Sequence, residues 1–155
     1  LSKHYLDTRA EATVFSVDRL AADLQAEIPE ARFVYLHGSA AEGVVPPHGD
    51  LDLAVFLDPD LLRVTTDDRD SGGLRMSVFE AAVGVADRVV PGIRCDVGFL
   101  NGTEPVYRFE VLKGRLLFCR DREQWLSFYS RTCREYESQL FHYERQWRYR
   151  LEARP

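Results

Sequence analysis

The most informative stretch of this 155-residue sequence is HGSAAEGVVPPHGDLDLAVF, residues 37–56. It continues a short run rich in β-formers (RFVYLH, residues 32–37), which predicts a strand that ends at Gly38-Ser39. Glycine permits a sharp turn there, and backbone N–H groups beside a serine hydroxyl bind anions. A phosphate is therefore the expected ligand of Gly38 and Ser39.

Two aspartates open the apolar run DLDLAVFL, which we expect to be a second strand covered on both faces. Because residues two apart on a strand share a face, the carboxylates of Asp50 and Asp52 should lie roughly 6.6 Å apart along it. Carboxylates that close repel each other unless a cation lies between them, and Mg²⁺ commonly bridges carboxylates to phosphates.

A third acid, Asp96, lies within the apolar run IRCDVGFL, residues 93–100, which predicts a third strand. An acid among apolar neighbours is costly without a partner. Asp96 could complete a two-metal site or act as a base. Together the residues predict a nucleoside triphosphate, with its phosphates on Gly38-Ser39 and a metal on the aspartates.

A lone Gly-Ser is usually a turn, and a lone D-x-D is usually the end of a strand. Their order here, with ten residues between Ser39 and Asp50, is far more specific. It resembles the signature of the polymerase-β-like nucleotidyltransferases. The HGSAAEG start and the DLDLAVFL and CDVGFLN strands resemble the minimal members, and above all the MntA-type antitoxins that pair with HEPN-domain toxins. The resemblance covers roughly residues 33–119.

The resemblance implies an α/β (α+β) fold, a small mixed β-sheet with helices packed mainly on one side. It also implies roles for the motif residues. Gly38 and Ser39 would hold the triphosphate, Asp50 and Asp52 would bind two Mg²⁺ ions, and Asp96 would bind the second ion and help to deprotonate the attacking hydroxyl. In-line attack at the α-phosphate would transfer a nucleoside monophosphate and release pyrophosphate.

In the antitoxin family the nucleotide is ATP, and the acceptor is a tyrosine hydroxyl of the HEPN toxin. The resemblance therefore implies a Mg²⁺-dependent protein adenylyltransferase that acts as an antitoxin. Two alternatives remain open. The chain could be a non-catalytic binding module that neutralises its partner by occlusion, or a nucleotidyltransferase for a small molecule such as an aminoglycoside.

The turn after Gly38 departs from related sequences, which often carry a basic residue there. Here it contains Glu42 and no base, so the phosphate charge must be met by metal, by backbone N–H groups or by a distant arginine such as Arg75 or Arg94. We expect His48 to be an exposed loop residue and His37 to pack at the end of its strand.

Elsewhere, apolar spacing predicts helices over about Thr8–Ile28 and Leu74–Val90. Residues 44–49, with two prolines and a glycine, should be a loop, as should the polar run 67–73, which could also cover the nucleotide as a lid. We expect a short helix over Pro105–Leu112 and a short edge strand over Arg115–Cys119.

The last segment, about residues 121–151, should form one long helix with an aromatic stripe. Such a helix is longer than a sheet this small can bury. Aromatic and arginine side chains are enriched at protein interfaces, so we expect this helix to dock the partner or a second copy of the chain, giving a hetero-oligomer or a homo-oligomer. The aromatic and basic residues are Tyr136, Tyr143, Trp147, Tyr149, Arg145, Arg148 and Arg150.

Length and composition (45% hydrophobic, 29% charged) predict one globular domain over residues 1–155, with a core of about 31–119. The net charge of −5 disfavours direct nucleic-acid binding. No apolar run approaches the ~18 residues of a membrane span. Three widely spaced cysteines fit reduced thiols in the cytoplasm.

Overall fold

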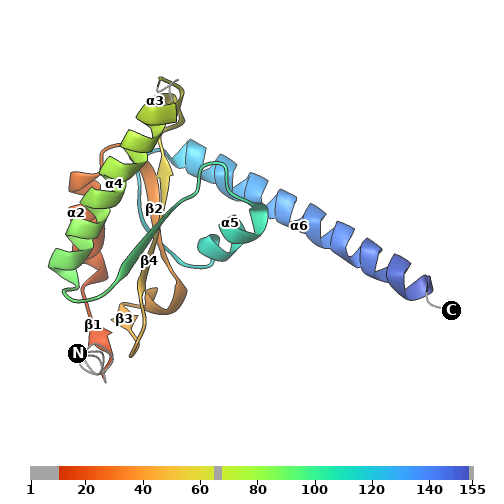
Figure 1. The fold of residues 1–155 in the computed structure, drawn as a ribbon, viewed down its shortest axis with the longest axis horizontal. Helices are drawn as coiled ribbons and strands as arrows, with labels where there is room; N and C mark the ends of the chain where they lie inside the picture. Colours follow the sequence, from red (N-terminus) through yellow and green to blue (C-terminus); the bar gives the residue numbers. More distant parts are fainter. Residues whose placement is uncertain (1–10, 65–67, 154–155) are drawn as a thin grey trace.

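The computed structural model describes residues 11–64 and 68–153, with side chains described outside 65–72. A four-stranded sheet forms its centre, in the order β5-β4-β2-β6 (Figure 1). Strand β4 runs parallel to β5, and β2 runs antiparallel to both β4 and β6, so the sheet is mixed as expected. The strands are β2 (Ala31–His37), β4 (Leu51–Leu57), β5 (Cys95–Phe99) and β6 (Arg115–Cys119).

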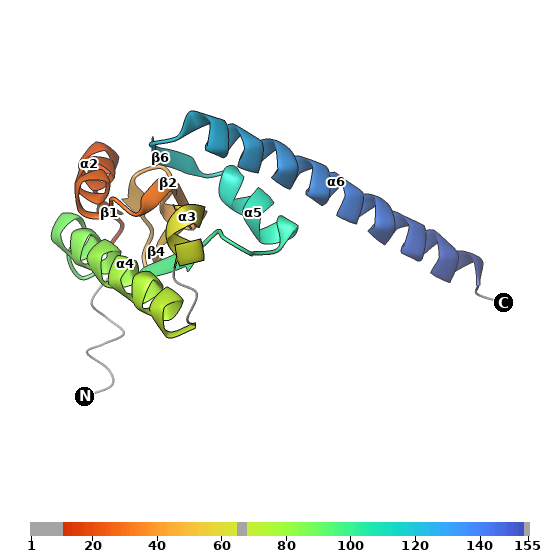
Figure 2. The same cartoon turned by 90° about the horizontal axis from the view of Figure 1, so that it is seen from above.

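Helices cover both faces of the sheet (Figure 2), as the apolar run of β4 predicted, although the family resemblance implied helices mainly on one side. Helices α2 (Val17–Glu27) and α4 (Asp68–Val89) pack on one face, whereas α5 (Pro105–Leu112) and the first half of α6 (Arg122–Glu152) pack on the other. The physical reason is that β2 and β4 are apolar on both sides, so each face has its own buried cluster.

The cluster under α5 and α6 is aromatic. The ring of Phe33 is fully buried and stacks on Phe56, with the centroids 4.6 Å apart, and Phe128 of α6 packs against both. The indole N–H of Trp125 donates a 2.7 Å hydrogen bond to the hydroxyl of Tyr35. These contacts fix the first turns of α6 to the sheet.

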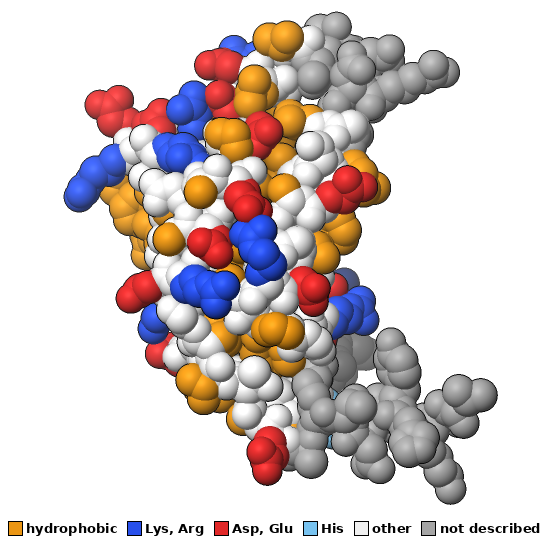
Figure 3. All heavy atoms as spheres, turned by 90° about the vertical axis from the view of Figure 1, so that its left-hand side faces the viewer, with side chains coloured by type: hydrophobic (Ala, Val, Ile, Leu, Met, Phe, Trp, Pro, Cys, Tyr) orange, Lys and Arg blue, Asp and Glu red, His pale blue; other side chains and the backbone are white. Residues whose placement is uncertain are grey.

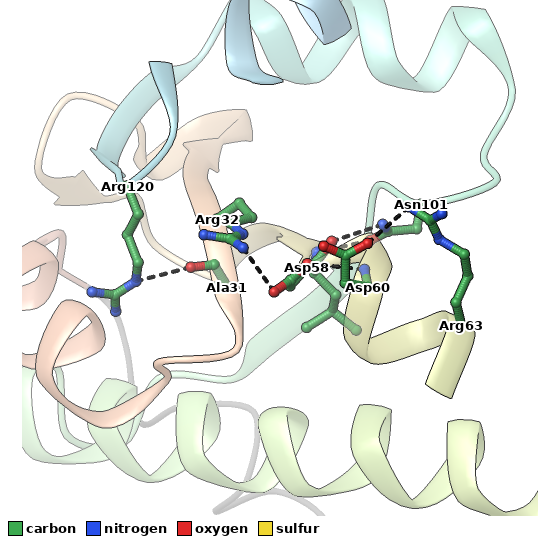
Figure 4. Close-up of polar contacts among 8 residues, drawn as sticks. Ala31, Arg32, Asp58, Asp60, Arg63, Asn101 and Arg120 are labelled. Carbon is green, nitrogen blue, oxygen red and sulfur yellow. Dashed lines mark hydrogen bonds and ion pairs between the residues drawn. The ribbon is translucent and has the colours of Figure 1, made fainter. Parts of the chain in front are cut away.

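Polar contacts close the end of the sheet at which β4 ends (Figure 4). Arg32 pairs with Asp58 at 2.8 Å, and the Asn101 side chain both accepts from and donates to the backbone of Leu57. Arg120 donates to the carbonyl of Ala31. The opposite end, at which β4 begins, is where the aspartates of the motif lie.

The N-terminal helix is shorter than expected. It begins at Val17, because the hydroxyl of Ser16 accepts the N–H of Arg19 and caps the helix. Residues Thr13–Val14 instead form β1, which pairs with β3 (Val44–Val45) inside the expected loop. A two-residue pairing between distant segments leaves no periodic signal. Residues 8–10 of the expected helix lie outside the described residues.

A second difference follows β4. Helix α3 (Pro59–Val64) was not expected, although Asp58 accepts the N–H of Asp60 as a cap and proline suits the first helical position. Helix α4 begins at Asp68, so the polar run expected as a loop is helical from there, and residue 67 is outside the described part. Polar residues are common both in loops and in the first turn of a helix, so the sequence predicted a loop where α4 begins.

The last three predicted elements are confirmed. Helix α5 and edge strand β6 have the expected bounds, and α6 spans 31 residues after a cap by Asp121. From Glu137 onward every residue of α6 is exposed, and this part projects beyond the body of the molecule (Figures 1 and 2).

The outer surface of α2 and α4 carries interspersed charges of both signs (Figure 3). Arg88, for example, pairs with Glu27 at 2.8 Å and with Asp23 at 3.7 Å. This face is an ordinary solvated surface. Within the described residues, no helix combines the length and apolar character needed to cross a membrane.

Candidate functional site

Three polar side chains lie side by side where β4 begins. In the sheet register, Asp52 of β4 is the partner of His37 on β2 and of Asp96 on β5. Side chains alternate along a strand, so Asp52 shares the face of Ala54 and Phe56, which is the face covered by α5. The structure therefore places two of the expected acids on neighbouring strands and adds a histidine.

Gly38 presses against this row. It begins the 3₁₀ turn η1 (Gly38–Ala40) with φ of +74°, and an added Cβ would lie 2.5 Å from Oδ2 of Asp52. Only glycine tolerates both the left-handed backbone and the close approach. Ser39 is exposed on the same turn. The turn expected to bind phosphate thus adjoins Asp52, one of the expected metal ligands.

Burial and, to a smaller extent, neighbouring charges shift the pKa of Asp52. Burial raises the pKa of its carboxyl above the ordinary value, His37 opposes that rise, and Asp96 and Asp50 add to it. Asp50 lies immediately before β4 and acts on Asp52 through its negative charge. Both other acids of the motif therefore act on Asp52 at one end of the sheet.

Asp96 has a basic neighbour. Its Oδ1 lies 3.4 Å from Nε of Arg94, and both side chains are largely exposed. In the described part of the chain, no three His, Cys, Asp or Glu side chains converge into a cluster that could hold a metal ion as they stand. The acids are adjacent in the sheet, but they are not drawn together as a finished metal centre.

Tyr107 and Gly98 also lie at the site, although the sequence assigned neither of them to it. The ring of Tyr107, from α5, packs edge-on against His37, with centroids 6.1 Å apart. A Cβ on Gly98 would collide with the Tyr107 hydroxyl, so this glycine admits the tyrosine. Burial and then the charge of Asp52 raise the pKa of Tyr107. Tyr107 forms a wall of the site.

His37 packs at the end of its strand, as expected, and lies beside Asp52. Burial lowers the pKa of its imidazole, and the negative charge of Asp52 opposes that effect. The sequence held a usable signal, because antiparallel pairing of the two strands around the turn places their adjoining ends opposite each other. His48, by contrast, is exposed in the loop, as expected.

Glu42, the acidic residue of the turn after Gly38, forms an ion pair with a residue of β6. Glu42 lies 3.5 Å from Nη2 of Arg115 on β6, and its side chain is 89% exposed. Arg75 does not approach the site. It lies near the start of α4, whose far end leads into β5, and α4 covers the opposite face of the sheet. Arg94 is therefore the arginine of the two that the structure brings to the aspartates.

Cys95 immediately precedes Asp96 but offers no reactive thiolate. Burial, followed by the charges of Asp96 and Asp52, raises its pKa to about 12. A thiol of that acidity is almost entirely protonated near neutral pH and is a poor nucleophile. The chemistry of the site therefore rests on its oxygen and nitrogen groups.

Comparison with known proteins agrees with this geometry. The family model described as polymerase beta, nucleotidyltransferase matches residues 21–123. The chain belongs to this nucleotidyltransferase family. The matched residues include Gly38-Ser39, strand β4 with Asp52 and strand β5 with Asp96. None of the curated proteins matches the sequence.

Several solved structures share the fold. A structure of a toxin–antitoxin with AMP-PNP aligns with a TM-score of 0.57 and 22% identity, over 84% of this chain and 93% of the other. A tri-AMPylated Shewanella oneidensis HEPN toxin in complex with MNT antitoxin gives 0.53 and 22%, over 84% and 90%. The toxin–antitoxin MntA–HepT gives 0.52 and 21%, over the same shares. At these identities the likeness establishes the fold.

Proposed function

We propose that this nucleotidyltransferase is an antitoxin that moves AMP from ATP to a tyrosine hydroxyl of a HEPN-type toxin. The observation that carries the proposal is the row His37, Asp52 and Asp96 on three adjacent strands, with Gly38 pressed against Asp52. Structures of the same fold are described with AMP-PNP and with an AMPylated HEPN toxin, which supports this nucleotide and this partner.

The donor set fits magnesium. Asp50, Asp52 and Asp96 supply hard carboxylate oxygens, and the influence of Asp50 and Asp96 on the pKa of Asp52 shows a repulsion that divalent cations relieve. We assign these three residues as ligands of two Mg²⁺ ions. When bound, the ions would neutralise charge on the triphosphate and on the attacking and leaving oxygens.

The chain's own residues bind and orient the substrates. Gly38 and Ser39 offer backbone N–H groups and a hydroxyl to the triphosphate, and Arg94 supplies a positive charge that the turn around Glu42 lacks. His37 lies opposite Asp52 in the sheet register and is the basic side chain of the row.

In the transfer step, the acceptor oxygen bonds to the α-phosphorus. The bond from that phosphorus to the oxygen bridging to the β-phosphate breaks, and pyrophosphate leaves. Asp96 is the base that takes the acceptor proton. An ATP-dependent reaction and three free cysteines fit a cytoplasmic location.

The test is the intact mass of a HEPN-domain protein from the same source genome after incubation with this chain, Mg²⁺ and each nucleoside triphosphate in turn. We expect a mass gain of one or more AMP groups with ATP and the wild-type chain. The Asp50→Asn/Asp52→Asn variant should give none, and a folded circular dichroism spectrum should accompany it.

Two other outcomes point to the alternatives. A stable complex without any mass gain would reject transfer and favour neutralisation by occlusion. A gain on an aminoglycoside and not on the protein would favour a small-molecule transferase.

A further inference from the structure

Arg94 lies among the three acids of the candidate site. The N–H of Leu51 donates a 2.9 Å hydrogen bond to the carbonyl of Arg94, which fixes the arginine backbone beside the start of β4. Asp50 precedes Leu51 and so lies next to Arg94 across the two parallel strands, while Asp52 is the register partner of Asp96. Three acidic side chains and one basic side chain therefore lie together where β4 and β5 begin.

The side chain of Arg94 is on the same face of the sheet as the acids. Residues two apart on a strand share a face, and the ion pair between Arg94 and Asp96 agrees with this, because Nε of Arg94 lies 3.4 Å from Oδ1 of Asp96. Asp52 shares that face as the cross-strand partner of Asp96. A guanidinium is not deprotonated in proteins, so Arg94 gives these carboxylates a permanent positive neighbour.

The acids need such a neighbour when no metal is bound. Besides burial, which is the largest cause, the negative charges of Asp96 and Asp50 raise the pKa of Asp52. Within the part of the chain that the structure describes, no three potential ligands converge as a finished metal centre. The guanidinium of Arg94 compensates charge at Asp96, where a divalent cation is expected to do so in the loaded site.

The ion pair of Arg94 is of a kind that another charge can displace. The two side chains are 74% and 49% exposed, and their separation of 3.4 Å exceeds the ~2.7–2.9 Å of a strong charge-assisted hydrogen bond. Exposed ion pairs add little to stability. Arg32, by contrast, is 34% exposed and is held by Asp58 at 2.8 Å. Arg94 can therefore exchange Asp96 for another anion without weakening the fold.

We propose that Arg94 has two successive anionic partners, Asp96 in the metal-free chain and the triphosphate in the nucleotide complex, and that this exchange couples metal binding to nucleotide binding. A divalent cation that arrives alone must compete with the guanidinium for Asp96. The metal complex of ATP brings phosphates that draw the guanidinium away. The proposal rests on the proposed function in taking ATP and Mg²⁺ as the ligands.

The test measures two affinities separately in the full chain. Mn²⁺ is titrated alone and followed by electron paramagnetic resonance, and a non-hydrolysable ATP analogue is titrated at saturating Mg²⁺ and followed by calorimetry. Arg94→Gln removes the charge, and Arg94→Lys keeps it. Arg63→Gln is the matched control, because Arg63 is 78% exposed, pairs with Asp60 at 2.8 Å and lies beyond the other end of β4.

We expect the two affinities of Arg94→Gln to shift in opposite directions. Mn²⁺ alone should bind about tenfold more tightly, because a unit charge roughly 6 Å from a divalent ion in water changes its affinity by about that factor. The ATP analogue should bind at least about tenfold more weakly, because a charged hydrogen bond to phosphate is lost. Arg94→Lys should keep the wild-type affinity for Mn²⁺, and Arg63→Gln should keep both affinities.

Each contrary result has a distinct meaning. Shifts of both affinities in the same direction would overturn the proposal, and a joint loss would mean that Arg94 only holds Asp96 in place. Unchanged binding of either ligand would overturn it as well, because one of the two partners would then be missing. A wild type that binds neither ligand would overturn it together with the proposed function. Opposite shifts without any mass gain on the HEPN-domain protein would support the role of Arg94 and reject transfer to that acceptor.

Discussion

Replacing Gly38 with alanine strains the backbone of the turn and also disturbs its contact with Asp52. A control glycine with the same backbone but no such contact separates the two effects. Gly38 has φ of +74°, a conformation that costs an alanine about 1–2 kcal/mol. Its new Cβ would also lie 2.5 Å from Oδ2 of Asp52, whereas ordinary contact begins at 3.4 Å. The carboxylate and the turn must therefore separate by about 0.9 Å.

Two effects of different size follow from these numbers. The free energy of unfolding, measured by urea denaturation, should fall by about 1–2 kcal/mol. AMP transfer should fall by about 100-fold, because displacing a reacting group by about 1 Å costs roughly that factor. Transfer would be followed as the initial rate of mass gain on the acceptor at saturating ATP.

Gly102→Ala is the matched control. Gly102 has φ of +73°, but no heavy atom outside its chain neighbours lies within 4 Å of an added Cβ, and it follows β5 at the opposite end of the sheet. This variant should lose the same stability and keep full transfer. If Gly38→Ala transferred as fast as Gly102→Ala, the close approach of Gly38 to Asp52 would have no role in the chemistry.

Two further predictions concern stability. Tyr35→Phe leaves the indole N–H of Trp125 without its acceptor and should cost about 1–3 kcal/mol in urea unfolding at neutral pH. Burial raises the pKa of Tyr35, so the folded state keeps a proton that the unfolded state loses, and wild-type stability should fall as the pH rises above about 10, more steeply than that of the variant. Glu135→Ala removes the counter-charge of Arg108, whose side chain is 9% exposed, and should lower the free energy of unfolding by about 1–3 kcal/mol. The control Glu137→Ala, at an exposed position, should change it by no more than about 0.5 kcal/mol. Equal losses in the two variants would contradict the importance of pairing the buried guanidinium.

The sequence predicted those parts of the fold whose signals are local. Pro105 at the start of α5 and Gly114 after it bounded that helix, and RLLFC after Gly114 was correctly placed as an edge strand. The long α6 followed from its aromatic stripe, and the structure adds Asp121 as its N-terminal cap. In each case the residues that mark the ends of an element agreed with the apolar periodicity inside it.

The elements that the sequence misassigned depend on distant partners or on caps. Strands β1 and β3 exist because Thr13–Val14 pairs with Val44–Val45, some thirty residues away. The start of α4 was taken for a loop because polar residues are common to loops and first helical turns. The apolar run of β4 did predict that both of its faces are covered, whereas the identity of the helices on each face followed from tertiary packing.

The residues of the candidate site also fall into two groups, those that the sequence predicted and those that only the tertiary structure places. The motif identified Gly38, Ser39, Asp50, Asp52 and Asp96, and the register brings Asp52 and Asp96 together on parallel strands. The place of Tyr107 beside His37 depended on the packing of α5 over Gly98. The pairing of Glu42 with Arg115 joins residues 73 positions apart. Such contacts follow from tertiary structure alone.

The central claim is that the acids at the start of β4 and on β5 bind divalent cations together with ATP. The most direct test is electron paramagnetic resonance of Mn²⁺, used in place of Mg²⁺, titrated with the chain and a non-hydrolysable ATP analogue. Asp60→Asn is the control, because Asp60 is 74% exposed and lies beyond the other end of β4. We predict that the wild type and Asp60→Asn bind Mn²⁺ alike and that Asp52→Asn binds at least about tenfold more weakly. Equal binding by Asp52→Asn and the wild type would contradict the account.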